Sequence, residues 1–180
     1  GGSRESYRRI ELWPDPFPEA LVTELRRAVS SPADGAVVLF LGQTRESAGT
    51  PAPGQEASAA DHAGQPVERL EYEAFEALAI KEGSRIVQEA TAKFGICRAA
   101  CVHRAGDLAV GELAVWVGVS AAHRQEAFAA CRYIIDEVKH RVPIWKKEHY
   151  EDGNSGWVNC ERCAEAADGQ HHEGGVPHSH

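Results

Sequence analysis

Four cationic side chains lie within nine residues of a chain whose formal net charge is −8. They are Lys139, Arg141, Lys146 and Lys147. Pro143 divides this cluster, because proline lacks the backbone N–H that a helix interior needs and favours extended geometry in the residue before it. We therefore expect Lys139 on the last turn of a helix that stops near Val142, and Lys146 on the extended segment that follows.

Crowded lysines have two chemical uses. Mutual repulsion and burial lower the pKa of an ammonium group, which makes a neutral amine available as a base or nucleophile. The same charges could instead bind an anion. A third interpretation is that cations near a helix C-terminus only complement the helix dipole and remain in water. The local sequence leaves all three open.

Two other basic elements occur where predicted strands end. Arg45 follows an apolar run, with Gln43 and Thr44 before it, and His123 and Arg124 open a predicted helix. A helix N-terminus offers free N–H groups to an anion, and an arginine fork suits phosphate. If the fold joins these elements to the lysines, they form a phosphate pocket; otherwise they are solvated surface charges.

The elements that must position these residues alternate between strand and helix. Apolar runs and alternation predict strands over residues 5–12, 36–41, 67–73, 96–103 and 113–119. Helical spacing predicts helices over 19–29 and 75–94, the latter closed by Gly95, and a third one that Ser120 caps. We interpret His103 and Arg104 as structural residues before a turn over 104–107. The resulting class is α+β, with two strand pairs and helices packed on one side.

Composition limits the class of protein. A chain of 180 residues with 43% apolar and 26% charged residues is typical of one soluble domain. We expect no membrane span, since no apolar run reaches about 18 residues, and no nucleic-acid partner, since the chain is acidic. Cys97, Cys101 and Cys131 lie in apolar contexts, which predicts small buried residues and a reducing, cytoplasmic location.

Three segments fall outside the predicted fold. Residues 1–4 resemble a vector remnant and we expect no signal peptide. Residues 47–66 are polar and small, which predicts a flexible loop, and residues 159–180 are predicted to be a disordered tail. The domain then spans residues 5–158. Cys160 and Cys163 in the tail, with His171 and His172, are weak evidence for zinc, and we expect no metal.

Five segments in order resemble the MoaE family, the large, catalytic subunit of molybdopterin synthase. They are Gly35–Arg45, Leu70–Ala74, Val102–Leu108, Gly118–Arg124 and Val142–Glu148, and the resemblance covers about residues 35–158. The Ser-x-x-His-Arg and Pro-x-Trp-Lys-Lys-Glu motifs are together highly specific. The resemblance implies an α/β-hammerhead fold with a mixed or antiparallel sheet. It also implies a homodimer that carries a small ubiquitin-like sulfur-carrier subunit at each end, and so a heterotetramer.

The resemblance further implies a sulfurtransferase that needs no cofactor. Sulfur passes from the C-terminal glycine thiocarboxylate of the small subunit to cyclic pyranopterin monophosphate, forming the dithiolene of molybdopterin. Lys139 and Lys146 match the family's catalytic lysines. The matching substrate-binding positions are Gln43, Thr44, Arg45, His123, Arg124, Lys139, Lys146, Lys147 and Glu148.

The sequence departs from the family pattern in two places. The segment 47–66 is longer than is common. The family can also supply an arginine from the partner subunit shortly after the tryptophan that matches Trp157; that region here is Asn159–Arg162, and we do not assign Arg162 to this role. Two other functions are weighed against the enzyme. One is a docking module that holds a partner's acidic C-terminus in the cationic groove, and the other is a phosphate-ester enzyme without a protein partner.

Overall fold

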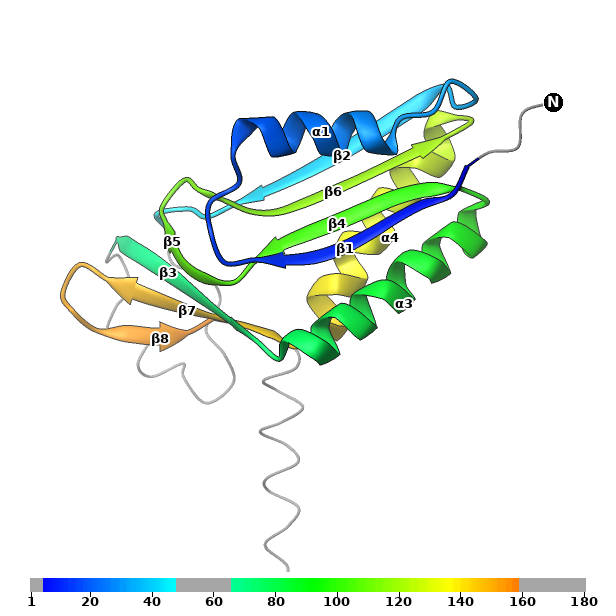
Figure 1. Cartoon of the computed structure of the whole chain (residues 1–180). Helices are drawn as coiled ribbons and strands as arrows, with labels where there is room; N and C mark the ends of the chain where they lie inside the picture. Colours follow the sequence, from blue (N-terminus) through cyan, green and yellow to red (C-terminus); the bar gives the residue numbers. More distant parts are fainter. Residues whose placement is uncertain (1–4, 48–65, 159–180) are drawn as a thin grey trace, which may run out of the picture.

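The computed structural model describes residues 5–47 and 66–158, and within them the chain forms two four-stranded sheets and three helices (Figure 1). The α+β class predicted from the sequence is confirmed. No described helix combines the length and apolar character that a membrane-spanning helix requires.

Sheet A is mixed and carries the main core. Its strands lie in the order β1 (Tyr7–Trp13), β4 (Arg98–Arg104), β6 (Leu113–Ala121) and β2 (Ala36–Gln43). β1 and β4 are parallel, and the other two pairs are antiparallel. The central strands β4 and β6 are buried along almost their whole length, as expected of strands covered on both faces.

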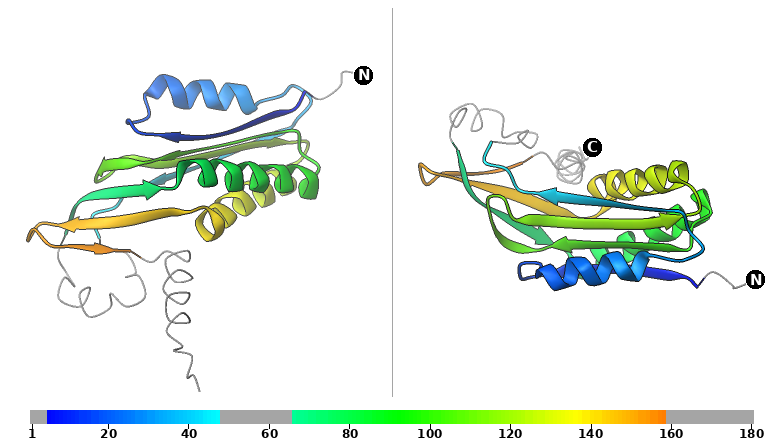
Figure 2. Two further views of the ribbon diagram at one scale, coloured as in Figure 1. Left: turned by 60° about the horizontal axis from the view of Figure 1, so that its bottom comes forward. Right: turned by 90° about the horizontal axis from the view of Figure 1, so that it is seen from above.

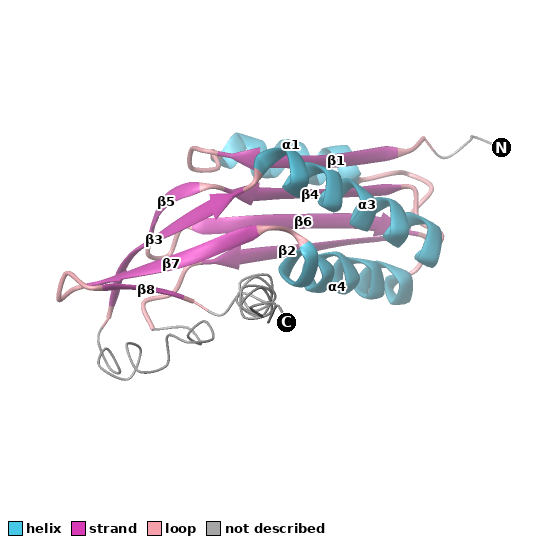
Figure 3. Ribbon diagram, turned by 90° about the horizontal axis from the view of Figure 1, so that it is seen from below, coloured by secondary structure: helices cyan, strands magenta, loops and turns pink. Residues whose placement is uncertain are grey.

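Helices cover both faces of sheet A, so the prediction that they pack on one side is wrong. α3 (Glu76–Phe94) and α4 (Arg124–Arg141) lie on one face, and α1 (Glu19–Val29) lies on the other (Figures 2 and 3). Alternate residues of β6 supply both cores: Val117 packs among α3 and α4, and Trp116 packs with Leu25 of α1. The continuous apolar run in β6 is the sequence signal of this double burial.

Sheet C is a smaller antiparallel sheet beyond the end of sheet A where β2 and β4 finish (Figure 1). Its order is β5 (Gly106–Ala109), β3 (Val67–Ala74), β7 (Ile144–Tyr150) and β8 (Ser155–Trp157). A small core of Val67, Leu70 and Tyr150 packs on one face. Residues 104–107 are thus not only a turn, since β5 begins at Gly106, and β8 was not predicted.

Helix boundaries follow the predicted ones closely. α1 matches its predicted range, and α3 ends before Gly95, whose φ of 64° is the left-handed conformation that glycine adopts readily. Ser120 does not cap α4, because β6 continues to Ala121 and His123 takes the cap position. Ser120 is buried and its hydroxyl donates to Asp34 Oδ2 at 2.8 Å.

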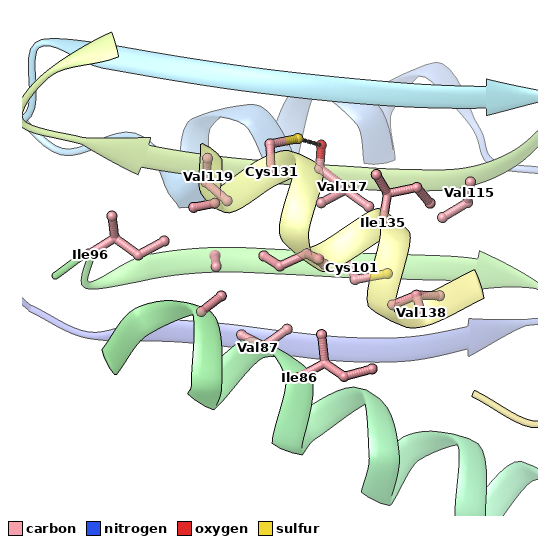
Figure 4. Packing of buried hydrophobic residues seen from close by; sticks show 14 of the residues in the cluster. Ile86, Val87, Ile96, Cys101, Val115, Val117, Val119, Cys131, Ile135 and Val138 are labelled. Atoms are coloured by element: carbon pink, nitrogen blue, oxygen red, sulfur yellow. Dashed lines mark hydrogen bonds between the residues drawn. The ribbon is translucent and has the colours of Figure 1, made fainter. Parts of the chain in front are cut away.

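The cysteines in the described residues are free thiols. Cys101 and Cys131 are buried in the core between α3, α4 and sheet A, which confirms their predicted burial, whereas Cys97 is half-buried (Figure 4). Burial raises the pKa of Cys101 to about 12 and that of Cys131 to about 11, so neither is a reactive thiolate at neutral pH.

The ends of the predicted loop over 47–66 lie together. The Val67 N–H donates to the Glu46 carbonyl at 2.8 Å, so the segment leaves and rejoins the fold at one point. Residues 1–4, 48–65 and 159–180 lie outside the described residues, as do Cys160, Cys163, Arg162, His171 and His172. The domain boundaries and the absence of a metal site therefore stay predictions.

We expect Gly118→Ala to lower the free energy of unfolding by about 1–3 kcal/mol, the usual cost of overpacking a core. A Cβ at Gly118 would overlap Trp116 Cη2, and the Trp116 side chain is fully buried, so it has no free space to move into. Urea unfolding measures the loss. Gly156→Ala is the control, because its Cβ would meet the Tyr150 hydroxyl at 3.5 Å, an ordinary contact. Equal stability of the two variants would contradict the packing described for Trp116.

Candidate active site

The two lysines lie on either side of the junction between α4 and sheet C. α4 ends at Arg141, Val142 is extended with φ −77° and ψ 128°, and β7 begins at Ile144 directly after Pro143. The Pro143 carbonyl accepts from the Phe75 N–H at 3.3 Å, which ties this turn to the start of α3. Lys139 thus lies on the last turn of a helix and Lys146 on a strand, as predicted from Pro143.

Lys146 is a half-buried cation among other cations. It lies opposite Tyr72 of β3 in the register of sheet C. Its pKa is lowered first by burial and then by the charges of Lys139 and Arg45, while the carboxylate of Glu148 raises it and offsets part of the shift. These couplings bring together three of the predicted site residues, from the end of α4, from β7 and from the chain just after β2.

Glu148 is the buried counter-charge of this cluster. Its side chain is only 2% exposed, and it accepts a hydrogen bond from the Tyr150 hydroxyl at 3.3 Å. Burial, together with this carboxylate, raises the pKa of Tyr72 and of Tyr150 to about 12. Both phenols are therefore protonated donors near neutral pH.

Lys147 does not share the face of Lys146, because successive side chains of a strand point to opposite sides. Its ammonium lies 5.4 Å from the centre of the Trp157 ring, a cation–π contact on the other face of sheet C. His149, on the same face, lies 3.2 Å from Glu71 Oε2. The role of Lys147 in substrate binding stays a prediction, and this geometry does not favour it.

Thr44 anchors the end of β2, whereas the residues on either side of it are exposed. Thr44 is buried; its hydroxyl donates to the Ala109 carbonyl at 2.7 Å and its N–H to the Glu112 carbonyl at 3.0 Å. These bonds tie the end of β2 to the turn between β5 and β6. Gln43 and Arg45 on either side are exposed, so Thr44 fixes the backbone beside Arg45, whose charge acts on Lys146.

His123 and Arg124 lie at the opposite end of α4 from Lys139. Both are exposed, and 15 residues of helix separate Arg124 from Lys139. At about 1.5 Å per residue, the two positions are about 22 Å apart along the helix axis. One chain therefore does not bring His123 and Arg124 together with the lysines.

His103 and Arg104, predicted to be structural, have different surroundings. Arg104 is 1% exposed and donates to Glu112 Oε1 at 2.5 Å and to the carbonyls of Trp13 and Asp107, which confirms a structural role. His103 lies on the other face of β4, where its ring packs edge-on against Tyr72 with centroids 5.2 Å apart.

The charges of two lysines act on His103, a surrounding that the sequence did not indicate. Burial lowers its pKa to about 4, the bond to the Arg104 carbonyl opposes this shift, and the charges of Lys139, Arg104 and Lys146 add to it. Alternation along β4 places His103 on the same face as Cys101, towards α4. That alternation was readable in the sequence, but the approach of α4 was not.

The arrangement can bind anions and offer an amine. Arg45, Lys139 and Lys146 supply positive charge, and the half-buried Lys146 has a lowered pKa that increases its neutral fraction. The same three side chains could stabilise negative charge that develops during a reaction.

Known proteins match the chain over most of its length. The family model described as "MoaE protein" matches residues 18–141. The molybdopterin synthase catalytic subunit of Pyrococcus abyssi is 43% identical over 141 residues, covering 78% of this chain and 85% of that protein. The protein of the same name from Nostoc sp. is 36% identical over 151 residues, covering 83% of each.

Solved structures agree with the sequence matches. Molybdopterin synthase from Staphylococcus aureus has 32% sequence identity and a TM-score of 0.66, covering 87% of this chain and 98% of that one. A complex of subunits 1 and 2 of molybdopterin-converting factor from Helicobacter pylori shares the fold at 17% identity, with a TM-score of 0.63, covering 82% of this chain and 88% of that one. The family model and the two relatives show that this chain belongs to the MoaE family.

Proposed function

We propose that the chain is the catalytic subunit of a molybdopterin synthase. It would transfer sulfur from the thiocarboxylated C-terminal glycine of a small sulfur-carrier subunit to cyclic pyranopterin monophosphate, forming the dithiolene of molybdopterin. Family membership supports this reaction. The observation that links this reaction to particular residues is the environment of Lys146, which is half-buried and subject to the charges of Lys139 and Arg45.

Both substrates of this reaction are anions, which fits the charges in the site. The pterin carries a cyclic phosphate that must open, and the small subunit ends in a thiocarboxylate. We assign Lys146 to the thiocarboxylate and to the negative charge that develops as sulfur attacks, and Lys139 to proton transfer at the pterin. Arg45 would hold the phosphate, and Glu148 limits how far the pKa of Lys146 falls.

A second copy of the chain would explain how His123 and Arg124 come close to the lysines. β2 is an edge strand of sheet A, and Val37, Leu39 and Leu41 are 42%, 36% and 45% exposed along it. Exposed apolar edge strands are usually covered in the assembled protein. We infer that this row packs against the same row of a second copy, which makes a homodimer.

A two-fold axis near Leu39 would complete the site. The start of β2 lies next to the start of α4, since the Gly35 N–H donates to the Ala122 carbonyl at 3.2 Å. The end of β2 leads to Arg45. Two antiparallel copies of β2 then place the start of α4 of one copy beside Arg45 of the other. The eight residues of β2 span about 26 Å at about 3.3 Å each, similar to the separation along α4.

The small subunit is the other inferred partner. The Helicobacter pylori structure is described as a protein–protein complex of subunits 1 and 2, and by family resemblance we propose one small subunit bound to each catalytic chain, which makes a heterotetramer. The free thiols of Cys97, Cys101 and Cys131 are in keeping with a reducing, cytoplasmic location.

The pKa of Lys146 should respond in opposite directions to two substitutions. Lys139→Met removes a cation and should raise it, whereas Glu148→Gln removes an anion and should lower it further. The pH dependence of Lys146 acylation, followed by mass spectrometry, measures both shifts. Glu68→Gln, at an exposed position of β3, is the control and should leave the curve in place. Shifts of the same sign in both variants would contradict the described electrostatics.

Reconstitution tests the reaction itself. We expect wild-type chain, thiocarboxylated small subunit and cyclic pyranopterin monophosphate to give dithiolene product. Lys139→Ala should lower turnover by about 10²–10⁴-fold, as is usual for loss of a proton-transfer group. Lys81→Ala removes an exposed cation of α3 and serves as the control.

Three results would point away from the enzyme. A docking module would form the complex without product, and Lys139→Ala would then weaken only the binding of the small subunit. A phosphate-ester enzyme would consume substrate without any sulfur carrier. Full turnover by Lys139→Ala would remove Lys139 from the chemistry.

Mixed dimers test the shared site. Lys139→Ala and the double variant His123→Ala/Arg124→Ala should each be inactive alone. If each site takes residues from two chains, random mixing gives half heterodimers with one intact site each, so activity should recover to about a quarter of wild type. A chain with both sets of substitutions, mixed with Lys139→Ala, is the control and should recover no activity. No recovery in the first mixture would contradict a site shared between two chains.

A further inference from the structure

We propose that Glu89 of α3 is a positioning residue for Lys139: through its ion pair with Arg141 it holds the last turn of α4, from which Lys139 extends. This role rests on the proposed sulfur transfer, in which Lys139 transfers a proton. It adds a residue from a different helix, outside the segments that resemble the family in sequence.

The last turn of α4 needs support from outside the helix. α4 ends at Arg141, and Pro143, which cannot continue a helix, follows two residues later. The last carbonyl groups of a helix have no partner within it, so terminal turns open more easily than the middle. The side chain of Lys139 is exposed, so its place depends on the backbone of this turn.

Glu89 joins this turn to α3 through a bidentate ion pair. Arg141 donates from Nη1 to Glu89 Oε2 at 2.5 Å and from Nη2 to Glu89 Oε1 at 3.0 Å. The Tyr133 hydroxyl also donates to Glu89 Oε2, at 2.8 Å, which helps to fix the direction of the carboxylate. Exposed ion pairs usually contribute little to stability, but bidentate arginine–carboxylate pairs and charge networks are exceptions.

Two further carboxylates near Arg141 hold the turn less firmly. Glu82 Oε2 lies 3.4 Å from Arg141 Nη2, and Arg85 also pairs with Glu82, at 3.0 Å. Glu137 Oε2 lies 3.4 Å from Arg141 Nη1, but Glu137 belongs to α4 itself. A pair within one helix cannot tie that helix to another. Of these three carboxylates, only Glu89 joins the end of α4 to α3 by a short, bidentate contact.

Lys139 and Arg141 share the last turn of α4, and their Cα atoms are about 3 Å apart along the helix axis. If Arg141 loses Glu89, this turn can open, and the ammonium of Lys139 then occupies more positions. A misplaced proton-transfer group slows the chemical step more than it weakens substrate binding. Lys146 should stay in place, because the Phe75 N–H still donates to the Pro143 carbonyl at the start of β7.

A double-mutant cycle tests this role in the reconstituted complex. Glu89→Gln keeps the size of the side chain and removes its charge, and we expect it to lower kcat by about 5- to 20-fold with KM changed by less than about twofold. In a Lys139→Ala background the same substitution should cause no further loss, because no lysine remains to be positioned. A purely structural effect would lower kcat by the same factor in both backgrounds.

Glu137→Gln is the matched control. It removes a carboxylate from beside the same arginine but leaves the link between α3 and α4 intact. We therefore expect kcat to stay within about twofold of wild type, as is usual for a pair within one helix. A loss as large as that of Glu89→Gln would show that the charge near Arg141 matters, and not the link to α3.

Hydrogen exchange tests the link without activity. In the same complex, we expect the N–H groups of residues 140–142 to exchange about 5- to 20-fold faster in Glu89→Gln, while residues 128–134 in the middle of α4 stay protected over the same period. Wild type that transfers no sulfur would overturn the proposed reaction, whereas exchange reports on the link in either case. Unchanged exchange at 140–142, or an equal loss of kcat in both backgrounds, would overturn the role of Glu89.

Discussion

The repulsion among Arg45, Lys139 and Lys146 is the constraint that the rest of the site must satisfy. Burial and the two neighbouring cations all lower the pKa of Lys146, and Glu148 opposes them. Charges of one sign do not gather in this way unless the backbone holds them in place, because each charged group would have a lower free energy in water. Pro143, the pairing of β3 with β7 and the bonds of Thr44 supply that hold from three separate parts of the chain.

The four cations between Lys139 and Lys147 have different surroundings. Arg141 donates to Glu89 Oε2 at 2.5 Å and lies 3.4 Å from Glu82 and Glu137, and the Tyr133 hydroxyl also donates to Glu89. This network joins the last turn of α4 to α3. Since Lys139 lies on the same turn, the ion pairs of Arg141 fix the backbone from which Lys139 extends. Lys147 packs on Trp157 on the far face of sheet C. Arg141 and Lys147 thus contribute to the fold, whereas the charges of Lys139 and Lys146 act on each other.

Local patterns explain what the sequence could predict. Periodicity and the left-handed position of Gly95 set the bounds of α1 and α3, and Pro143 separated Lys139 from Lys146. The opposite faces of Lys146 and Lys147 were also readable, because alternation in a strand is a local rule. β8, with three residues, is too short for any periodic signal. Serine is a common helix cap, but β6 extends past Ser120, which pairs with Arg98 of β4 and is therefore part of a strand.

The remainder of the site depends on contacts between segments far apart in sequence. His103 acquires its surroundings only when β4 ends beside α4 and β3 brings Tyr72 across, which no window of sequence contains. The same limit applies to His123 and Arg124, which the motifs group with the lysines although α4 holds them about 22 Å apart. A rigid helix cannot close that distance. Either the two groups serve different sites, or the exposed apolar row of β2 is where a second chain supplies the missing end. The second explanation accounts for the helix length and for the apolar edge at once.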